Sequence, residues 1–172
     1  YPKKANYGNV YDIRRPENAE IMMLRILSYF VLTKQTPHIV LPVGTFNTSI
    51  KPFLTLSEKQ YVNSKKYDDF LKKYKKGEYH SNVSVLISEW ANGGDLLEYI
   101  RKNYKQMKTL DWKVLIFQIV STLATIQVKY PSFRHNDLKA NNILVHYIPK
   151  KDGKKNLFKY DVNGNKYGLP NI

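Results

Sequence analysis

Three polar side chains in one short run have the types that phosphoryl transfer requires. Asp137, Lys139 and Asn142 are separated by two and three residues, and the apolar run 143–145 follows them at once. Phosphoryl transfer needs a carboxylate facing the acceptor hydroxyl, a cation near the moving phosphoryl group and an oxygen ligand for Mg²⁺. We therefore predict this chemistry here, with a strand at 143–145. The alternative is a polar loop between a helix and a strand.

The run 134–145, RHNDLKANNILV, resembles the catalytic loop of eukaryotic-type protein kinases, H-R-D-L-K-x-x-N. The resemblance implies that Asp137 orients or deprotonates the acceptor hydroxyl, that Lys139 contacts the γ-phosphate and that Asn142 is a Mg²⁺ ligand. Asn136 stands where the family usually has Arg, and it cannot form the charge-assisted pair of that Arg with an activation-loop phosphate. Either activity does not depend on this phosphorylation, or the protein is related to small-molecule phosphotransferases. Lys139 favours the Ser/Thr protein kinases.

A second segment, residues 83–96, resembles the fifth strand, hinge and helix D of the same family. Residues 83–90 are rich in branched side chains and predict a strand, and Asn92-Gly93-Gly94 breaks it. The resemblance implies that ATP binds here, with Ser88 as a small gatekeeper beside the adenine. The adenine would bond to backbone groups of three consecutive residues, Glu89, Trp90 and Ala91. Asp95 lies where the family contacts the ribose, and it is equally suited to cap the next helix.

Residues after Pro16 have the spacing of a helix, and Pro suits the first helical position. In the kinase family, the helix at this place carries a Glu that pairs with a lysine on the preceding strand. Glu20 is the candidate and Glu17 a lesser rival; the alternative is that Glu20 is only a helix-end charge. The resemblance places the lysine, with a Gly-rich phosphate loop, upstream of this sequence. His38 follows Pro37 and is expected to be a turn residue rather than a metal ligand.

About thirty residues, 49–81, interrupt the kinase-like pattern. We predict a helix near 57–76 with Tyr61, Phe70, Leu71 and Tyr74 along one face. The insertion is rich in lysine: Lys51, Lys59, Lys65, Lys66, Lys72, Lys73, Lys75 and Lys76. It is either a solvated helix or a docking surface, over 51–76, for an acidic protein or nucleic acid.

Past the hinge, the sequence predicts one long helix and a hairpin. Apolar residues at helical spacing run from Asp111, the expected cap, to about Lys129, and predict a buried core helix. Beyond Val145, the Asp152-Gly153 and Asn163-Gly164 pairs indicate tight turns around a strand at 157–162. The kinase D-F-G motif, which holds Mg²⁺, is absent from the sequence, and the resemblance implies that it follows the hairpin.

Composition narrows the class of protein. The 172 residues carry a formal net charge of +14, which suggests an acidic partner, and contain no cysteine, which excludes disulfides and thiolate metal sites. No apolar run approaches the roughly 20 residues of a membrane span. We therefore expect an intracellular protein without a membrane span.

The hairpin, the insertion and the R-P-E-N lead into the first helix are similar to kinases of large nucleocytoplasmic DNA viruses. This similarity implies the host cytoplasm or the virion, where other virion proteins are possible partners.

Together these features predict an incomplete α+β, two-lobed protein-kinase-like fold. Residues 1–89 would be a partial N-lobe with the insertion at 49–81, and 90–172 a partial C-lobe with the catalytic loop 134–145 and a hairpin at 146–172. The intact parent protein would transfer phosphate from Mg-ATP to Ser or Thr hydroxyls of proteins, and this piece alone would be inactive. The alternatives are a pseudokinase or virion-associated binding module, and a small-molecule phosphotransferase.

Overall fold

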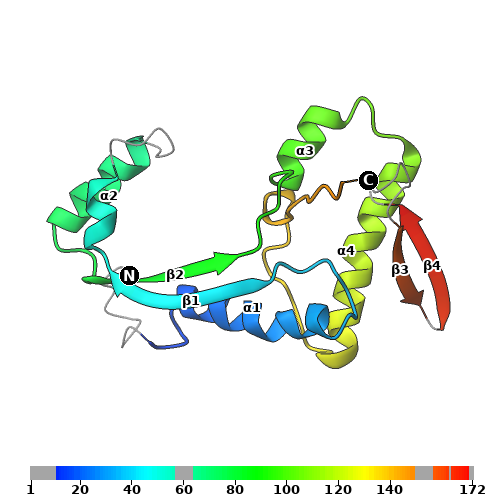
Figure 1. The fold of residues 1–172 in the computed structure, drawn as a ribbon, viewed down its shortest axis with the longest axis horizontal. Coiled ribbons are helices and arrows are strands. Elements are labelled where there is room, and N and C mark those ends of the chain that lie inside the picture. Colours follow the sequence, from blue (N-terminus) through cyan, green and yellow to red (C-terminus); the bar gives the residue numbers. More distant parts are fainter. Residues whose placement is uncertain (1–10, 57–63, 150–156, 163, 171–172) are drawn as a thin grey trace. The chain divides into compact units, whose positions relative to one another are not determined.

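The computed structural model describes residues 11–56, 64–149, 157–162 and 164–170. The chain forms two units. The first comprises Tyr1–Ile26 and Leu41–Ser88, and the second comprises Leu27–Val40 and Glu89–Ile172. Within these described ranges, the regular structure consists of helices and two small antiparallel sheets, in agreement with the predicted α+β class (Figure 1).

A two-stranded antiparallel ribbon forms the centre of the first unit. Strand β1 (Pro42–Ser49) pairs with β2 (Asn82–Ser88), with Thr45 opposite Leu86 and Ser49 opposite Asn82 (Figure 1). Branched side chains favour this extended, half-buried surface. The strand predicted at 83–90 is confirmed by β2, although β2 ends at Ser88.

The insertion folds into the short 3-10 helix η2 (Lys51–Thr55) and helix α2 (Ser64–Lys75). The predicted helix is confirmed from residue 64 onward, whereas its expected start and Tyr61 lie outside the described residues. The side chain that α2 buries is Tyr67, whose hydroxyl accepts a hydrogen bond from Leu56 N (3.0 Å) and donates one to Phe53 O (3.2 Å). These bonds fasten α2 to η2. Phe70, on the predicted apolar face, is half-buried.

Helix α1 (Pro16–Leu32) begins at the predicted proline. In the first unit, Arg25 donates a hydrogen bond from Nη2 to Thr45 Oγ1 of β1. In the second unit, the last turns of α1 bury Phe30 completely, with its ring edge-to-face against Tyr130 at 6.0 Å between centroids. Burying an aromatic side chain of this size anchors the end of the helix.

Two helices follow the hinge segment in the second unit, α3 (Leu96–Asn103) and α4 (Thr109–Lys129). The cap of α4 is not Asp111, as predicted, but Lys108. Asp111 lies three residues inside, where its carboxylate accepts a hydrogen bond from Lys108 N at 2.7 Å. A carboxylate suits this position because it lies in the positive first turn of the helix.

Helix α4 is only partly buried, which corrects the expectation of a core helix. Val114 and Ile126 are buried, whereas Ile116 and Val120 are each 57% exposed. By length and composition alone α4 passes the test for a membrane-spanning helix, as core helices of soluble proteins also do. The expected absence of a membrane span stays a prediction.

Strands β3 (Leu157–Val162) and β4 (Asn165–Pro170) form the predicted hairpin, with Tyr160 opposite Tyr167 (Figure 1). Its turn contains Gly164 at φ +79°, a conformation that glycine adopts without steric cost. The turn predicted at 152–153 lies outside the described residues. The strand predicted at 143–145 is not regular: Leu144 forms only an isolated bridge with Asp95.

Candidate active site

Two predicted catalytic side chains, those of Lys139 and Asn142, contact a third, Asp137, on the surface of the second unit. Lys139 donates a hydrogen bond from Nζ to Asp137 Oδ1 at 3.0 Å. Asn142 donates from Nδ2 to Asp137 Oδ2 at 2.7 Å and to the Asp137 carbonyl oxygen at 2.9 Å. Both carboxylate oxygens of Asp137 are thus held in place by neighbours within five residues. Their catalytic roles stay a prediction.

The electrostatics of this cluster keep Asp137 ionised. The hydrogen bond from the Lys139 ammonium, followed by that from Asn142, holds the pKa of Asp137 below its usual value. The cluster is open to solvent, with side-chain exposures of 64% for Asp137 and 56% for Lys139. An exposed, ionised carboxylate is suited to contact a hydroxyl group that arrives from solution.

The local backbone explains how the three side chains converge. Residues Ala140–Asn142 form the 3-10 helix η3, in which Asn142 N donates to Lys139 O at 2.8 Å. This tight turn brings Asn142 back toward Asp137. Asn136, immediately before Asp137, has φ +61°. Asn is among the non-glycine residues that tolerate this left-handed conformation best, so the residue type fits the backbone here.

Backbone hydrogen bonds join the segment after the loop to the predicted hinge. Gly93 N donates to Val145 O (2.9 Å), Val145 N to Gly94 O (2.9 Å) and Leu96 N to Ile143 O (2.8 Å). A Cβ atom on Gly93 would lie 2.7 Å from Val145 O, so glycine is required for this close approach. The predicted catalytic loop therefore leads directly into a ladder of backbone hydrogen bonds with the predicted hinge.

Asn92 adds a side-chain clamp to this ladder. Its Oδ1 accepts from Tyr147 N at 2.7 Å, and its Nδ2 donates to Tyr147 O at 3.1 Å. The amide thus pairs with both polar groups of one backbone residue, as a neighbouring strand would. Sequence reasoning missed this contact because its partners are 55 residues apart.

The predicted nucleotide-binding residues of the second unit lie at the start of this ladder. Glu89 and Trp90 are exposed, Trp90 at 85%, and Ala91 is half-buried. Asp95 is the N-cap of α3, where its Oδ1 accepts from Glu98 N at 2.9 Å. The predicted capping role of Asp95 is confirmed. That Asp95 binds the ribose stays a prediction, and so does the binding of adenine at residues 89–91.

Two predicted site residues belong to the first unit and are described only within it. Glu20 is exposed on α1 and forms no ion pair among the described residues. Its rival Glu17 is half-buried, and its Oε2 is buried without a hydrogen-bond partner in the described part of the chain. Ser88 ends β2 and is exposed. The roles of Glu20 and Ser88 stay predictions.

The residues present are chemically suited to Mg²⁺ but do not form a complete metal cage. Asn142 uses the nitrogen of its side-chain amide to bond to Asp137. The oxygen of the same amide is a hard ligand of the kind that Mg²⁺ prefers. The described residues contain no group of three His, Asp, Glu or Cys side chains able to hold a metal. Mg²⁺ typically keeps several waters and binds substrate phosphates, so one or two protein oxygens suffice.

The sequence of the chain is similar to those of known proteins. Over its whole length the chain is 49% identical to "Putative serine/threonine-protein kinase R400" of Acanthamoeba polyphaga mimivirus, and it spans 38% of that relative. A "Probable serine/threonine-protein kinase" of Dictyostelium discoideum is 39% identical over 64 residues, which are 37% of this chain and 5% of that protein. "Uncharacterized protein R402" of the mimivirus is 29% identical over 77% of this chain and 15% of its own.

No solved structure matches the chain. The predicted likeness to kinases of large DNA viruses is confirmed by the mimivirus relative. Residues 53–155 match the family model described as protein tyrosine and serine/threonine kinase, and the chain therefore belongs to the protein kinase family.

Proposed function

We propose that the protein containing this sequence transfers the γ-phosphate of Mg-ATP to Ser or Thr hydroxyls of proteins. The observation that supports this most directly is the Asp137 carboxylate, held on both oxygens by Lys139 and Asn142 beside the hinge ladder. The name of the 49% identical mimivirus relative supports the Ser/Thr assignment. The same relative supports action inside the host cell or the virion.

In the proposed reaction, the hydroxyl oxygen of the substrate attacks the γ-phosphorus, the bond to the β-phosphate oxygen breaks and ADP leaves. Asp137 accepts a hydrogen bond from the attacking hydroxyl and finally its proton. Its lowered pKa makes Asp137 a weak base, which suits a loose transition state in which orientation matters more than early proton removal. Lys139 has three N–H donors, so it can contact a γ-phosphate oxygen while it remains bonded to Asp137.

ATP would be held by backbone groups of Glu89, Trp90 and Ala91, with Ser88 beside the adenine and Asp95 near the ribose. Asn142 would contribute an oxygen ligand to Mg²⁺, which supplies charge neutralisation on the phosphates when bound. Glu20 would pair with the lysine that the kinase family carries on the strand before this helix. Residues 1–172 contain neither a Gly-rich phosphate loop nor D-F-G. Since such groups act as a unit, we expect this piece alone to turn over little ATP.

Asn136 supports a second candidate, a small-molecule phosphotransferase, because its neutral side chain cannot pair with an activation-loop phosphate. A third candidate is a pseudokinase or virion-associated binding module, in which the same scaffold binds without transfer. Degenerate phosphate-loop and D-F-G segments in the full protein would favour this third candidate.

The test is a transfer assay with the full-length protein, radiolabelled ATP and Mg²⁺, offering a casein-like protein, aminoglycosides and choline side by side. We expect label on Ser or Thr of the protein substrate, and a loss of about 10²- to 10⁴-fold in Asp137→Asn. Label on a small molecule instead would establish the second candidate. ATP binding without any transfer would establish the third.

A further inference from the structure

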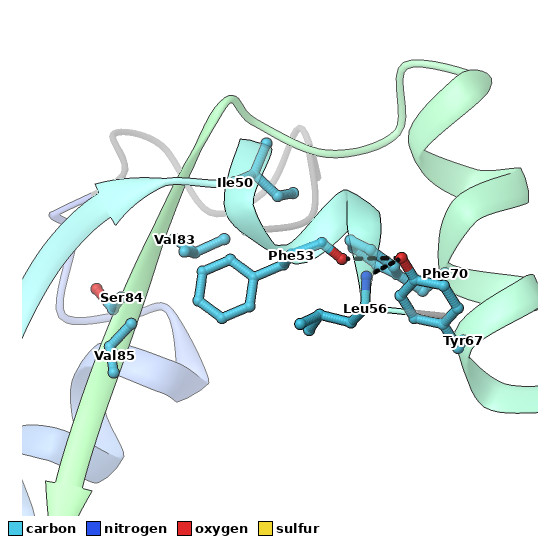
Figure 2. Close-up of a pocket in the computed structure, with 8 residues that line it drawn as sticks. All are labelled: Ile50, Phe53, Leu56, Tyr67, Phe70, Val83, Ser84 and Val85. Carbon is cyan, nitrogen blue, oxygen red and sulfur yellow. Dashed lines mark hydrogen bonds between the residues drawn. The ribbon is translucent and has the colours of Figure 1, made fainter. Parts of the chain in front are cut away.

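We propose that the lysine-rich insertion is a docking site for an acidic segment of a partner protein, which places an apolar side chain in a pocket beside α2. This inference concerns the first unit alone and does not depend on phosphate transfer. The pocket lies between η2, α2 and β2 (Figure 2) and has a volume of about 450 Å³. The described residues in its lining are Ile50, Phe53, Leu56, Tyr67, Phe70, Val83, Ser84 and Val85.

The pocket has almost no polar group left to offer a ligand. The Tyr67 hydroxyl is engaged by Leu56 N and Phe53 O, as the dashed lines in Figure 2 show. The hydroxyl of Ser84, the other polar side chain in the lining, bonds to Asn47 Oδ1. An occupant therefore gains affinity chiefly by removing apolar surface from water, as an inserted Phe or Leu side chain does.

The surface around the pocket carries positive charge. Phe70 lines the pocket from α2, and residues three and four positions away share its side of the helix. These positions include Lys66 and Lys73, both exposed. The acidic residues of α2, Asp68 and Asp69, are two positions and one position from Phe70 and therefore project to other sides. The rim of the pocket on α2 is thus basic although the helix contains both signs.

This combination selects one class of occupant. A second copy of the chain is disfavoured, because each copy carries a formal net charge of +14 and would bring like charges together. Nucleic acid would use the lysines, but among the described lining residues both polar side chains are already hydrogen-bonded, so little remains there to contact a base edge or phosphate. A peptide with an apolar anchor and acidic flanks uses both features, as in groove recognition of amphipathic segments.

The test measures fluorescence anisotropy of labelled peptides with the full 172-residue chain. The probe is a short peptide in which a Phe-Leu pair is flanked by glutamates. One matched peptide replaces the Phe-Leu pair by serines, and another replaces the glutamates by lysines. A single-stranded oligonucleotide is the fourth probe. We expect the first peptide to bind at least tenfold more tightly than either matched peptide and more tightly than the oligonucleotide.

Two substitutions then locate the binding site. Val83→Phe places a larger side chain in the pocket while keeping β-strand propensity, and we expect it to weaken binding by roughly tenfold or more. Lys73→Glu reverses a rim charge beside Phe70 and should weaken binding roughly threefold to tenfold, with a shallower salt dependence. Its matched control is the neighbouring Lys72→Glu, which carries the same charge change on another side of α2 and should change affinity less than twofold.

Because Lys73 is exposed, its substitution tests the site even if Val83→Phe disturbs folding, which circular dichroism would reveal. Equal losses in Lys73→Glu and Lys72→Glu would overturn the proposal in favour of unspecific charge attraction. Tighter binding of the oligonucleotide than of the acidic peptide would overturn it in favour of a nucleic-acid surface. Absence of binding by all four probes would also overturn it.

Discussion

Two polar contacts of the second unit differ in how far apart their partners lie along the chain. Asp137 bonds to side chains two and five residues away, whereas His38 Nε2 and the Tyr160 hydroxyl lie 2.7 Å apart across 122 residues. The Asp137 cluster is exposed, while His38 is part-buried and lies against the Phe158 ring. The chemistry is therefore assembled locally at the surface, and the attachment of the hairpin depends on tertiary packing.

The largest expected effect is on activity and involves the local cluster. Asn142→Ala removes two hydrogen bonds to Asp137 and the proposed oxygen ligand for Mg²⁺. We expect transfer by the full-length protein to fall by about 10²- to 10⁴-fold. The free energy of unfolding should change by no more than about 0.5 kcal/mol, because the site is exposed. Initial rates and urea titrations measure the two quantities.

The matched control is Asn141→Ala, next to it in η3. Asn141 is exposed and makes no side-chain hydrogen bond among the described residues, so both rate and stability should stay near their original values. If Asn142→Ala lowers stability strongly while the rate per folded molecule is kept, the Asp137 cluster serves stability rather than chemistry. It would then not differ in role from the His38–Tyr160 contact.

The second prediction concerns how stability depends on pH through His38, which contacts Tyr160. Burial lowers the pKa of His38 from 6.5 to about 4. Well above pH 6.5, His38 is neutral in both the folded and the unfolded chain. As pH falls from 6.5 to about 4, the unfolded state binds a proton that the folded state does not, so stability is lost across this window. A shift of this size corresponds to at most about 3 kcal/mol.

Urea unfolding of the chain at a series of pH values measures this loss. His38→Gln removes the titrating group, so its stability should fall less between pH 6.5 and 4 than that of the original chain. The other ionisable groups are unchanged in this variant and cancel in the difference. If the free energies of unfolding of the two proteins fall equally between pH 6.5 and 4, burial does not lower the pKa of His38, and the prediction is wrong.

Features encoded within a few residues were predictable from the sequence. Pro16 starts α1, Asp95 caps α3 and the Asp137 cluster forms within six residues, because each depends on local backbone geometry. Asp111 shows the limit of such reasoning. A carboxylate is favourable at both the cap and the third helical position, so the sequence left the helix start uncertain by a few residues.

Features that depend on distant partners were not predictable. Residues 143–145 have the composition of a strand, but their partners are the hinge residues that lead into α3, and only one bridge forms. Asn92 and Tyr147 are joined through side-chain and backbone atoms that no periodicity reveals. The roles of Glu20 and Ser88, and the lobe boundary at residues 89 and 90, stay predictions.

The third prediction tests the ladder that connects the loop to the hinge. Gly93→Ala would place Cβ 2.7 Å from Val145 O and 2.9 Å from the Tyr147 ring, so the backbone must move apart. We expect a destabilisation of about 1–3 kcal/mol in urea unfolding. Gly44→Ala in β1 is the control, because its added methyl group meets nothing within 4 Å. Equal stability of the two variants would mean that the close approach at Gly93 is not required.

The smallest expected effect comes from removing the Tyr160 hydroxyl, which bonds to His38. Tyr160→Phe keeps the ring that packs edge-to-face on Phe117 at 5.0 Å but removes the hydroxyl bonded to His38. The loss should be about 1 kcal/mol, because the hydroxyl group loses its hydrogen bonds to His38 and Gln118. Tyr167→Phe, directly opposite on β4, makes the same chemical change at an exposed site and should be nearly neutral. If both variants lose equal stability, the hydroxyl of Tyr160 contributes no more than a solvated one, and ring packing alone attaches the hairpin.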